Sequence, residues 1–235
     1  MKKLFVLLCA GASFVGQAQS KFGIHAGAIS ADMKETYDGE SEVDLKSRVS
    51  FRAGVHASFP VSSKISIMPQ LNYLSKGSRI DESESTDIFG FPYSITVTGH
   101  YKLNYLELPV HFVYNQPMAK GNSFFIGIGP SFSYGLSGEA KASVIENDNG
   151  TIYEESNTVD IKFDGQDNAT STDNYGHYKA FEFGLSMIAG YHFTPNFFVN
   201  LNFNQGLSNI NPDKIEKGET KTMYVGLGIG YYFSK

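Results

Sequence analysis

The chain of 235 residues has no tryptophan and a single cysteine, Cys9. Cys9 lies in a segment that we expect to be cleaved, so the mature chain would have no disulfide, no cysteine-ligated metal and no thiol nucleophile. The 19 lysines and arginines are outnumbered by 24 acidic residues and form no cluster, which argues against a nucleic-acid partner. After residue 18 no apolar run is long enough for a transmembrane helix.

The first 18 residues have the pattern of a secretory signal peptide. Two lysines precede an apolar stretch that ends near Gly16, and Gly16 and Ala18 supply the small residues of a cleavage site. The apolar stretch is too short for a membrane anchor. We therefore divide the chain into a signal peptide, 1–18, and an exported domain, 19–235.

What the exported part has in abundance is alternation of apolar and polar residues with the period of a β-strand. The stretch from Val49 to Phe59 is the clearest case, with valine, phenylalanine and alanine on one face and arginine, serine and histidine on the other. Eight such segments are expected. They are 21–30, 47–59, 64–75, 96–114, 123–137, 179–193, 197–208 and 222–233.

The connections between these segments alternate in length. The long ones are 31–46, 76–95, 138–178 and 209–221, and the short ones are 60–63, 115–122 and 194–196. Short periplasmic turns, longer external loops and an even strand count are typical of outer-membrane barrels. We therefore predict an all-β fold, an eight-stranded up-and-down antiparallel transmembrane β-barrel, with 138–178 outside the cell and 115–122 in the periplasm.

Acidic residues and glycines indicate which face of the sheet meets which solvent. The long connections hold 22 of the 24 acids, and the other two, Glu107 and Glu182, lie on the polar face. Periodicity alone also allows a lipocalin-like soluble barrel with an apolar interior. Glycines on the polar face suit a narrow polar lumen, and phenylalanines and tyrosines near strand ends suit aromatic girdles. We therefore expect the apolar face to meet outer-membrane lipid.

Several segments resemble the PorT-like outer-membrane β-barrel family. They are YKLNYLELPVHFVYN at 101–115, FFIGIGPSFSYGL at 124–136, QGLSNI at 205–210 and the terminal GLGIGYYF. The resemblance covers essentially the whole mature chain. It implies an outer-membrane barrel of a Gram-negative bacterium, and the terminal aromatic residues are similar to the signal read by barrel-assembly machinery. The best-known member of that family serves protein secretion, which implies a possible envelope or secretion partner.

Eight strands close a barrel whose interior is filled by side chains, and charges enclosed there should be paired. Counted inward from the aromatic rim, Arg52 is level with Glu107, and Arg48 is level with Glu182. The sequence therefore predicts two lumenal ion pairs, Arg52–Glu107 and Arg48–Glu182. Pro109 cannot donate to a sheet ladder, so we expect a local bulge there.

Three histidines also fall at one level of the predicted lumen. His25, His56 and His111 each lie three residues inward from the rim. Histidines on rigid strands can converge on a metal, but we favour hydrogen-bonded lumenal histidines and predict neither a metal nor a cofactor.

Catalytic and calcium-binding patterns are weak. His177 and the serines and aspartates of 164–178 could supply parts of a hydrolytic site, but a long polar loop contains such neighbours by chance. The acidic stretch 146–155 lacks the spacing of a calcium loop. Alternation from Thr151 to Phe163 indicates that this hairpin extends beyond the membrane, either as a binding loop or as a solvated spacer.

These patterns predict a non-enzymatic envelope protein, structural or accessory to secretion or adhesion. A narrow porin-like transport channel and a membrane-embedded enzyme are the alternatives.

Overall fold

The computed structural model describes residues 20–37, 41–42, 45–88, 91–118, 121–168, 171–193, 196–213 and 218–233. The expected signal peptide, 1–18, lies outside these residues. No helix among the described residues is long and apolar enough to cross a membrane.

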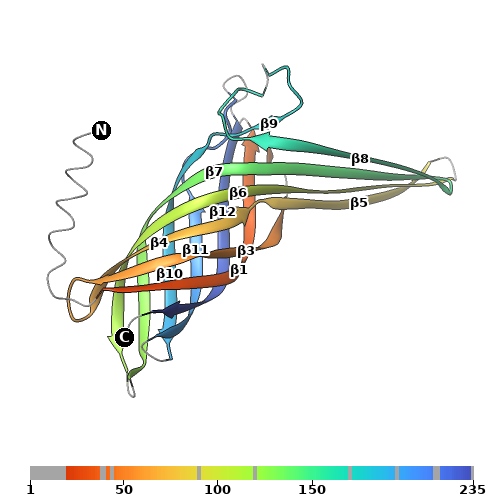
Figure 1. Cartoon of the computed structure of the whole chain (residues 1–235). Helices are drawn as coiled ribbons and strands as arrows, with labels where there is room; N and C mark the ends of the chain where they lie inside the picture. Colours follow the sequence, from red (N-terminus) through yellow and green to blue (C-terminus); the bar gives the residue numbers. More distant parts are fainter. Residues whose placement is uncertain are drawn as a thin grey trace.

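Eight antiparallel strands close a ring (Figure 1). Their order around the ring is β1, β3, β4, β6, β7, β10, β11 and β12, and β12 pairs again with β1. The bounds are β1 Lys21–Tyr37, β3 Lys46–Pro60, β4 Ile65–Lys76, β6 Phe91–Pro117, β7 Ser123–Asp148, β10 Phe181–His192, β11 Phe197–Gly206 and β12 Gly218–Tyr232. The structure confirms the predicted eight-stranded antiparallel barrel.

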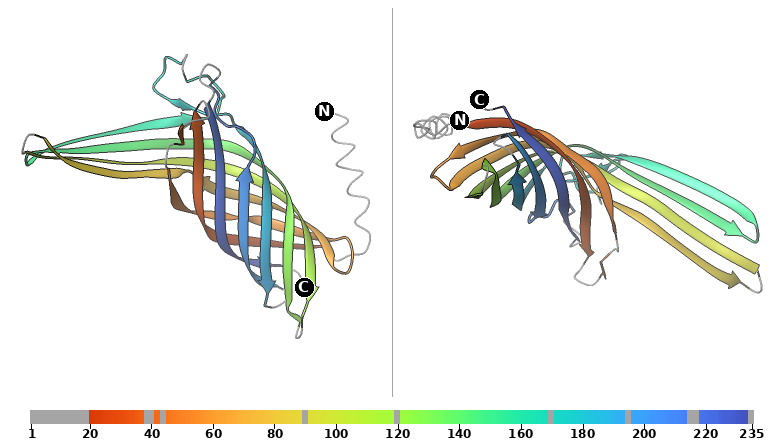
Figure 2. Two further views of the ribbon diagram at one scale, coloured as in Figure 1. Left: turned by 180° about the vertical axis from the view of Figure 1, so that it is seen from behind. Right: turned by 90° about the horizontal axis from the view of Figure 1, so that it is seen from below.

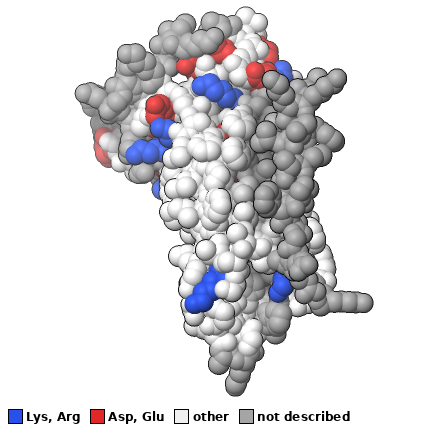
Figure 3. All heavy atoms as spheres, turned by 90° about the vertical axis from the view of Figure 1, so that its left-hand side faces the viewer, with Lys and Arg blue, Asp and Glu red and all other residues white. Residues whose placement is uncertain are grey.

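The apolar face of the barrel points outward. Phe112, Leu201 and Leu227 are 58%, 58% and 62% exposed, whereas Asn72 and Glu107 on the other face are fully buried. Figure 3 shows one face of the barrel, where charged side chains lie near both ends and none is visible in the zone between them. Such an apolar belt around a polar interior suits lipid, and it is the reverse of the lipocalin-like alternative.

Aromatic side chains gather at the end of the barrel that carries the short turns, called here the turn end. Phe22 packs edge-on against Phe59 at a centroid distance of 6.2 Å. Phe193 lies 5.1 Å from Tyr191 and 6.0 Å from Phe197. These residues belong to the rim expected from the sequence, and they form the girdle that anchors a barrel at a membrane interface.

Beyond the other end of the barrel, the loop end, four strands extend the same sheet. β5, Ser78–Ile88, and β8, Thr151–Lys162, flank the first half of β6 and the second half of β7. We call the part formed by residues 79–100 and 141–158 the extension. Figures 1 and 2 show that it leaves the barrel sideways.

The extension bears on two expectations for the long connections, one of which is confirmed and one of which is wrong. The hairpin predicted within 138–178 is confirmed, because β7 and β8 pair from Gly138 and Ile161 outward. Residues 76–95 are mostly strand, so the loop expected there is wrong. Two further strands are short, β2 at Ser41–Glu42 and β9 at Gly176–His177.

Gly77 and a register shift mark the junction between barrel and extension. Gly77 has φ of +136°, and a Cβ there would lie 2.0 Å from the Tyr101 carbonyl oxygen, so only glycine fits between β4 and β5. The pairing of β6 with β7 shifts between Asn104 and Tyr105. A bulge bends and twists a strand, which suits the start of the extension.

The bulge expected at Pro109 is wrong. Pro109 pairs with Ser131 in the same register as Phe112 with Ile128, and on the other side Val110 pairs with Pro69 in continuous register. The sheet therefore accommodates this proline without an extra residue.

Candidate functional site

A charged network fills the barrel near the loop end, with Lys76 at its centre. The Lys76 Nζ lies 2.8 Å from Glu182 Oε2 and 3.6 Å from Glu107 Oε2, and all three side chains are essentially unexposed. Tyr224 donates to Glu107 Oε1 at 2.7 Å, and Thr222 donates to Glu182 Oε1 at 2.6 Å. Buried charges need such partners, because an unpaired one is costly.

The predicted partners of the two carboxylates are therefore wrong, although both acids do lie inside the barrel. Arg52, which is buried, donates to Gln70 Oε1 at 3.3 Å and to Asn200 Oδ1 at 3.5 Å, and Arg48 donates to Ser75 Oγ at 3.3 Å. Lys76 takes both acids because it ends β4, at a position that the sequence assigned to a loop.

The three predicted lumenal histidines do not form one cluster. His25 Nδ1 lies 3.1 Å from His56 Nδ1, and His25 Nε2 lies 2.6 Å from Asn72 Oδ1. His111 instead contacts Ser186 Oγ at 2.9 Å. Within the described ranges, no three histidine, cysteine or acidic side chains are placed to hold a metal ion.

Apolar side chains pack across the lumen towards the turn end. Met68, Phe125, Phe198 and Tyr232 belong to one buried cluster. Phe198 lies 5.7 Å from Phe125 and 5.4 Å from Tyr232 between ring centroids. A hollow of about 410 Å³ at the turn end is lined by three of these residues. This cluster and the Lys76 network therefore both occupy the lumen, and a hollow remains towards the turn end of the described part of the barrel.

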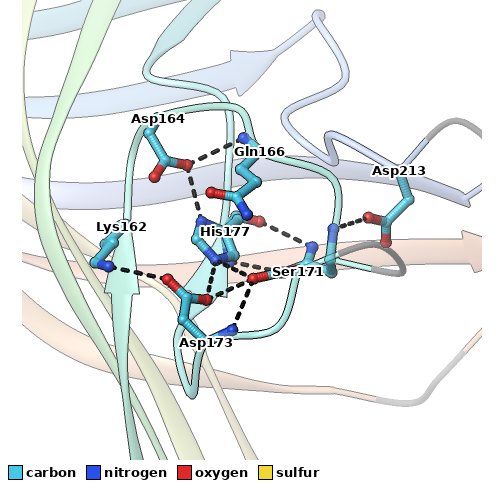
Figure 4. Close-up of polar contacts among 8 residues, drawn as sticks. Lys162, Asp164, Gln166, Ser171, Asp173, His177 and Asp213 are labelled. Atoms are coloured by element: carbon cyan, nitrogen blue, oxygen red, sulfur yellow. Dashed lines mark hydrogen bonds and ion pairs between the residues drawn. The ribbon is translucent and has the colours of Figure 1, made fainter.

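A polar cluster around His177 organises the loop that follows β8 (Figure 4). Its Nδ1 lies 2.8 Å from Asp164 Oδ1, and its Nε2 lies 2.9 Å from Asp173 Oδ1 and 3.2 Å from Ser171 Oγ. The Asn168 side chain accepts from His177 N and donates to His177 O, at 2.8 and 3.1 Å. The loop is thus fastened to β9 by both side chain and main chain.

The contacts Ser171–His177–Asp164 follow the order of a serine hydrolase triad, so the protonation of His177 decides what they can do. Burial opposes the charged ring, but hydrogen bonds to Asp173 and Asp164 outweigh it and raise the pKa of His177. Hydrogen bonds from Ser171 and His177 lower the pKa of Asp173. Both ring nitrogens face carboxylate oxygens, which favours a ring that donates from both of them, and the Ser171 hydroxyl itself donates to Asp173. This arrangement does not place His177 as a base for Ser171. The geometry is that of a structural clamp.

The two faces of the extension differ in chemistry. Cross-strand partners share a face, so the register assigns each side chain. The inner face continues the lumenal side, because its first residues, Ile80, Tyr101 and Ala140, pack on the core. Farther out it carries Glu82, Glu84, Tyr93, Ile95, Val97, Val144, Glu146, Asp148, Tyr153 and Glu155. The outer face is mostly polar but also carries two exposed isoleucines, Ile145 and Ile152. Its other residues include Arg79, Asp81, Ser83, Thr96, Thr98, His100, Lys141, Ser143, Glu154, Ser156 and Thr158.

The inner face combines an apolar strip with charge of one sign. Valine, isoleucine and tyrosine from the central strands β6 and β7 are flanked by glutamates on the edge strands β5 and β8. None of the described residues that the register places on this face is lysine or arginine. The sequence predicted the β7–β8 half of this surface as an extended hairpin, but not the β5–β6 half, because 76–95 was assigned to a loop.

Several solved outer-membrane proteins resemble the fold. Ail, the attachment invasion locus protein of Yersinia pestis, is 15% identical, with 92% of this chain and all of that chain covered and a TM-score of 0.37. OprG from Pseudomonas aeruginosa is 10% identical, with coverage of 94% and 99% and a TM-score of 0.44. Neisserial surface protein A is 11% identical, with coverage of 92% and 100% and a TM-score of 0.36. With TM-scores this low, these structures say nothing about the partners of this chain.

A comparison with curated proteins found no match. A family model does match, over residues 17–211, and its description is outer membrane protein beta-barrel domain. That range includes seven of the eight strands of the ring and the whole extension. The chain therefore belongs to the family of proteins with an outer membrane protein beta-barrel domain.

Proposed function

We propose that this protein is a closed outer-membrane anchor that presents its extension at the cell surface as a docking sheet for a protein partner. The loop end then lies outside the cell and the turn end in the periplasm, as loop length suggests. The PorT-like resemblance favours an accessory role in secretion, and adhesion is the second role that such a sheet would serve.

The uncovered inner face of the extension carries this proposal. A sheet normally buries its apolar face against a second layer, yet here Val97, Ile95 and Val144 have no layer above them among the described residues and stay partly exposed. Four strands of about ten residues present a face of about 600 Å². That approaches the roughly 800 Å² that each partner buries in a standard protein interface.

The lumen and the loop clamp support docking over the two rival functions. The Lys76 network and the apolar cluster fill the interior of the barrel, which opposes a transport channel. His177 has a carboxylate at each ring nitrogen, and the Ser171 hydroxyl donates to Asp173, which opposes a hydrolytic enzyme. Stable conductance in planar bilayers, well above leak, would favour the channel.

Neighbouring residues on opposite faces provide a matched experiment. A photo-crosslinking amino acid is placed in cells either at Val97, on the inner face, or at Thr98, on the outer face. We expect a discrete crosslinked protein from position 97 and much less of it from position 98. Equal crosslinking from both positions, or none from either, would contradict a docking sheet.

A further inference from the structure

We propose that the outer face of the extension holds a binding site for the phosphate groups of anionic lipid headgroups in the outer leaflet. The site is the hollow of about 650 Å³ lined by Arg48, Arg79, His100 and Lys141 together with neighbouring residues of β5 to β8. It does not depend on a protein partner, because it lies on the opposite face of the sheet from the proposed docking surface.

The cations form one transverse row. Lys46 pairs with Arg79, Arg79 with His100, and His100 with Lys141 along the sheet ladder. Neighbouring strands are about 4.8 Å apart, so four positively charged or titratable side chains span about 15 Å. Arg48 lines the same hollow from β3. Convergent lysine and arginine donors with this spacing suit phosphate oxygens, which arginine can bind with two parallel hydrogen bonds.

Two of these cations are unused inside the protein. Arg79 and Lys141 are exposed, and no ion pair within 4.0 Å joins either of them to the described part of the chain. His100 lies 3.6 Å from Glu139 Oε1, and Lys46 donates to the Asp81 carbonyl oxygen. The site therefore offers at least two free charges to a ligand.

Acidic residues in the hollow stand farther from the barrel than the cations. Asp81 lies one same-face residue farther from the barrel than Arg79. Glu154 pairs with Ile145, which lies two same-face residues farther from the barrel than Lys141. Alternate residues on one face are about 6.6 Å apart along a strand. The next row towards the barrel carries Lys102, Glu139 and Asp160, of which Glu139 faces His100. Among the side chains that line the hollow, the cations are therefore the ones nearest the barrel, where a headgroup from the surrounding membrane would approach.

The position of the row relative to the lipid belt identifies the membrane as the source of the phosphate. Along β6 from the barrel towards the extension, Leu108, Leu106 and then His100 lie on the same outward face. Because the extension bends sideways from the barrel (Figure 2), the face continuous with the lipid belt turns towards the membrane surface. Lysine and arginine next to an anionic leaflet are attracted to it, and the attraction falls off within a Debye length.

The absence of tryptophan makes a direct test possible. A single tryptophan, Thr98→Trp, would be the only one in the chain, placed in the lining of the hollow. The full-length protein is reconstituted in phosphatidylcholine vesicles that contain a trace of dansyl-labelled lipid and increasing fractions of phosphatidylglycerol. We expect energy transfer from this tryptophan to rise with phosphatidylglycerol and to fall with added salt.

Charge-removing variants complete the experiment. Arg79→Gln and Lys141→Gln should each reduce the response to phosphatidylglycerol roughly fivefold, as expected for one charge beside an anionic surface. Lys64→Gln removes the same charge from the turn end and should change nothing. Migration of the unheated barrel on a gel confirms folding of each variant.

Two results would overturn the assignment. An unchanged response in the Arg79→Gln, Lys141→Gln double variant would show that these cations do not hold the headgroup. A change in Thr98→Trp emission on adding inorganic phosphate to pure phosphatidylcholine vesicles, as large as that from phosphatidylglycerol, would identify a site for small anions instead of lipid.

Discussion

Strands β6 and β7 pass through both the barrel and the extension, and in β6 the polarity of the two faces inverts on the way. In the barrel, Leu106 and Leu108 of β6 point outward while Glu107 is buried inside. In the extension, Thr96 and Thr98 hold the outer positions, and Val97 holds the inner one. The inversion occurs across the register shift at Asn104 and Tyr105.

The two solvents explain the inversion. Lipid favours apolar side chains on the outside of the barrel and forces polar ones into the lumen. Beyond the membrane, water on all sides gives no reason to collect apolar residues on one face unless another layer covers that face. The barrel is thus complete as it stands, whereas the extension has the surface pattern of half of a two-layer structure.

The largest loss of stability, confined to the barrel, should come from replacing Lys76. Replacing Lys76 with methionine removes the charge that faces Glu107 and Glu182 and leaves two carboxylates buried together. Loss of one partner from a buried ion pair typically costs about 3–5 kcal/mol, so the midpoint of urea unfolding should fall steeply.

A compensated variant tests the cause. With Glu107→Gln and Glu182→Gln added to Lys76→Met, no lumenal carboxylate of this network remains, and most of the stability should return. If the changes in unfolding free energy from the three substitutions simply add, the network does not stabilise this part of the barrel.

Strands could be predicted from the sequence chiefly where contact with lipid imposes an alternation of apolar and polar residues. The ring of eight strands was predictable because lipid forces strict alternation on every spanning segment, as from Val49 to Phe59. Strand β5 was not, because its edge-strand sequence, with Asp81, Glu82 and Glu84, has no apolar face. Acid-rich strands in water look like loops.

Side-chain partners inside the lumen were less predictable than the strands. Counting from the rim placed Glu107 and Glu182 inside the barrel, but the actual partner depends on where β4 ends. The structure continues β4 through Lys76, and alternation with the buried Asn72 and Leu74 places Lys76 inside the lumen, immediately before the positive φ of Gly77. His25 and His56 do meet, whereas His111 at a similar counted level does not join them. Counting residues from the rim gives the height of a side chain along the barrel axis, but not the side of the barrel from which that side chain points into the lumen.

A smaller effect is expected at the clamp beside the junction. The pKa of His177 is raised above its usual 6.5, so its contribution is complete below that pH and is lost as pH rises through the raised value. The pKa of Asp164 is lowered from 3.8, mainly by the Gln166 main chain and His177, so its contribution is lost only as pH falls below that range. The loop should be most stable against local opening between about pH 4 and about pH 6.5.

Hydrogen-exchange protection factors around Gly176 and His177, corrected for intrinsic rates, measure this effect. Protection should fall severalfold between pH about 5.5 and about 9, because the half-exposed carboxylates are partly screened by water. His177→Gln should remove the pH dependence. Equal protection at both pH values would mean that the main-chain bonds to Asn168 hold the loop without the charge.

The smallest effect should come from removing the extension itself. Deleting 82–97 and 144–155, and closing each hairpin with a short turn after the Asp81–Thr98 and Ser143–Ser156 pairs, keeps the register of every barrel strand. The closed ring and its lumen contribute the burial, and the single-layer sheet contributes little, so the urea midpoint should hardly move. Intact cells treated with a glutamate-specific protease should meanwhile lose the cuts at Glu146 and Glu154, which lie in the deleted part and which protein with the extension should show. A steep fall in the midpoint would mean that the extension is part of the barrel's own stability, and the contrast between a complete barrel and an uncovered half-structure would fail.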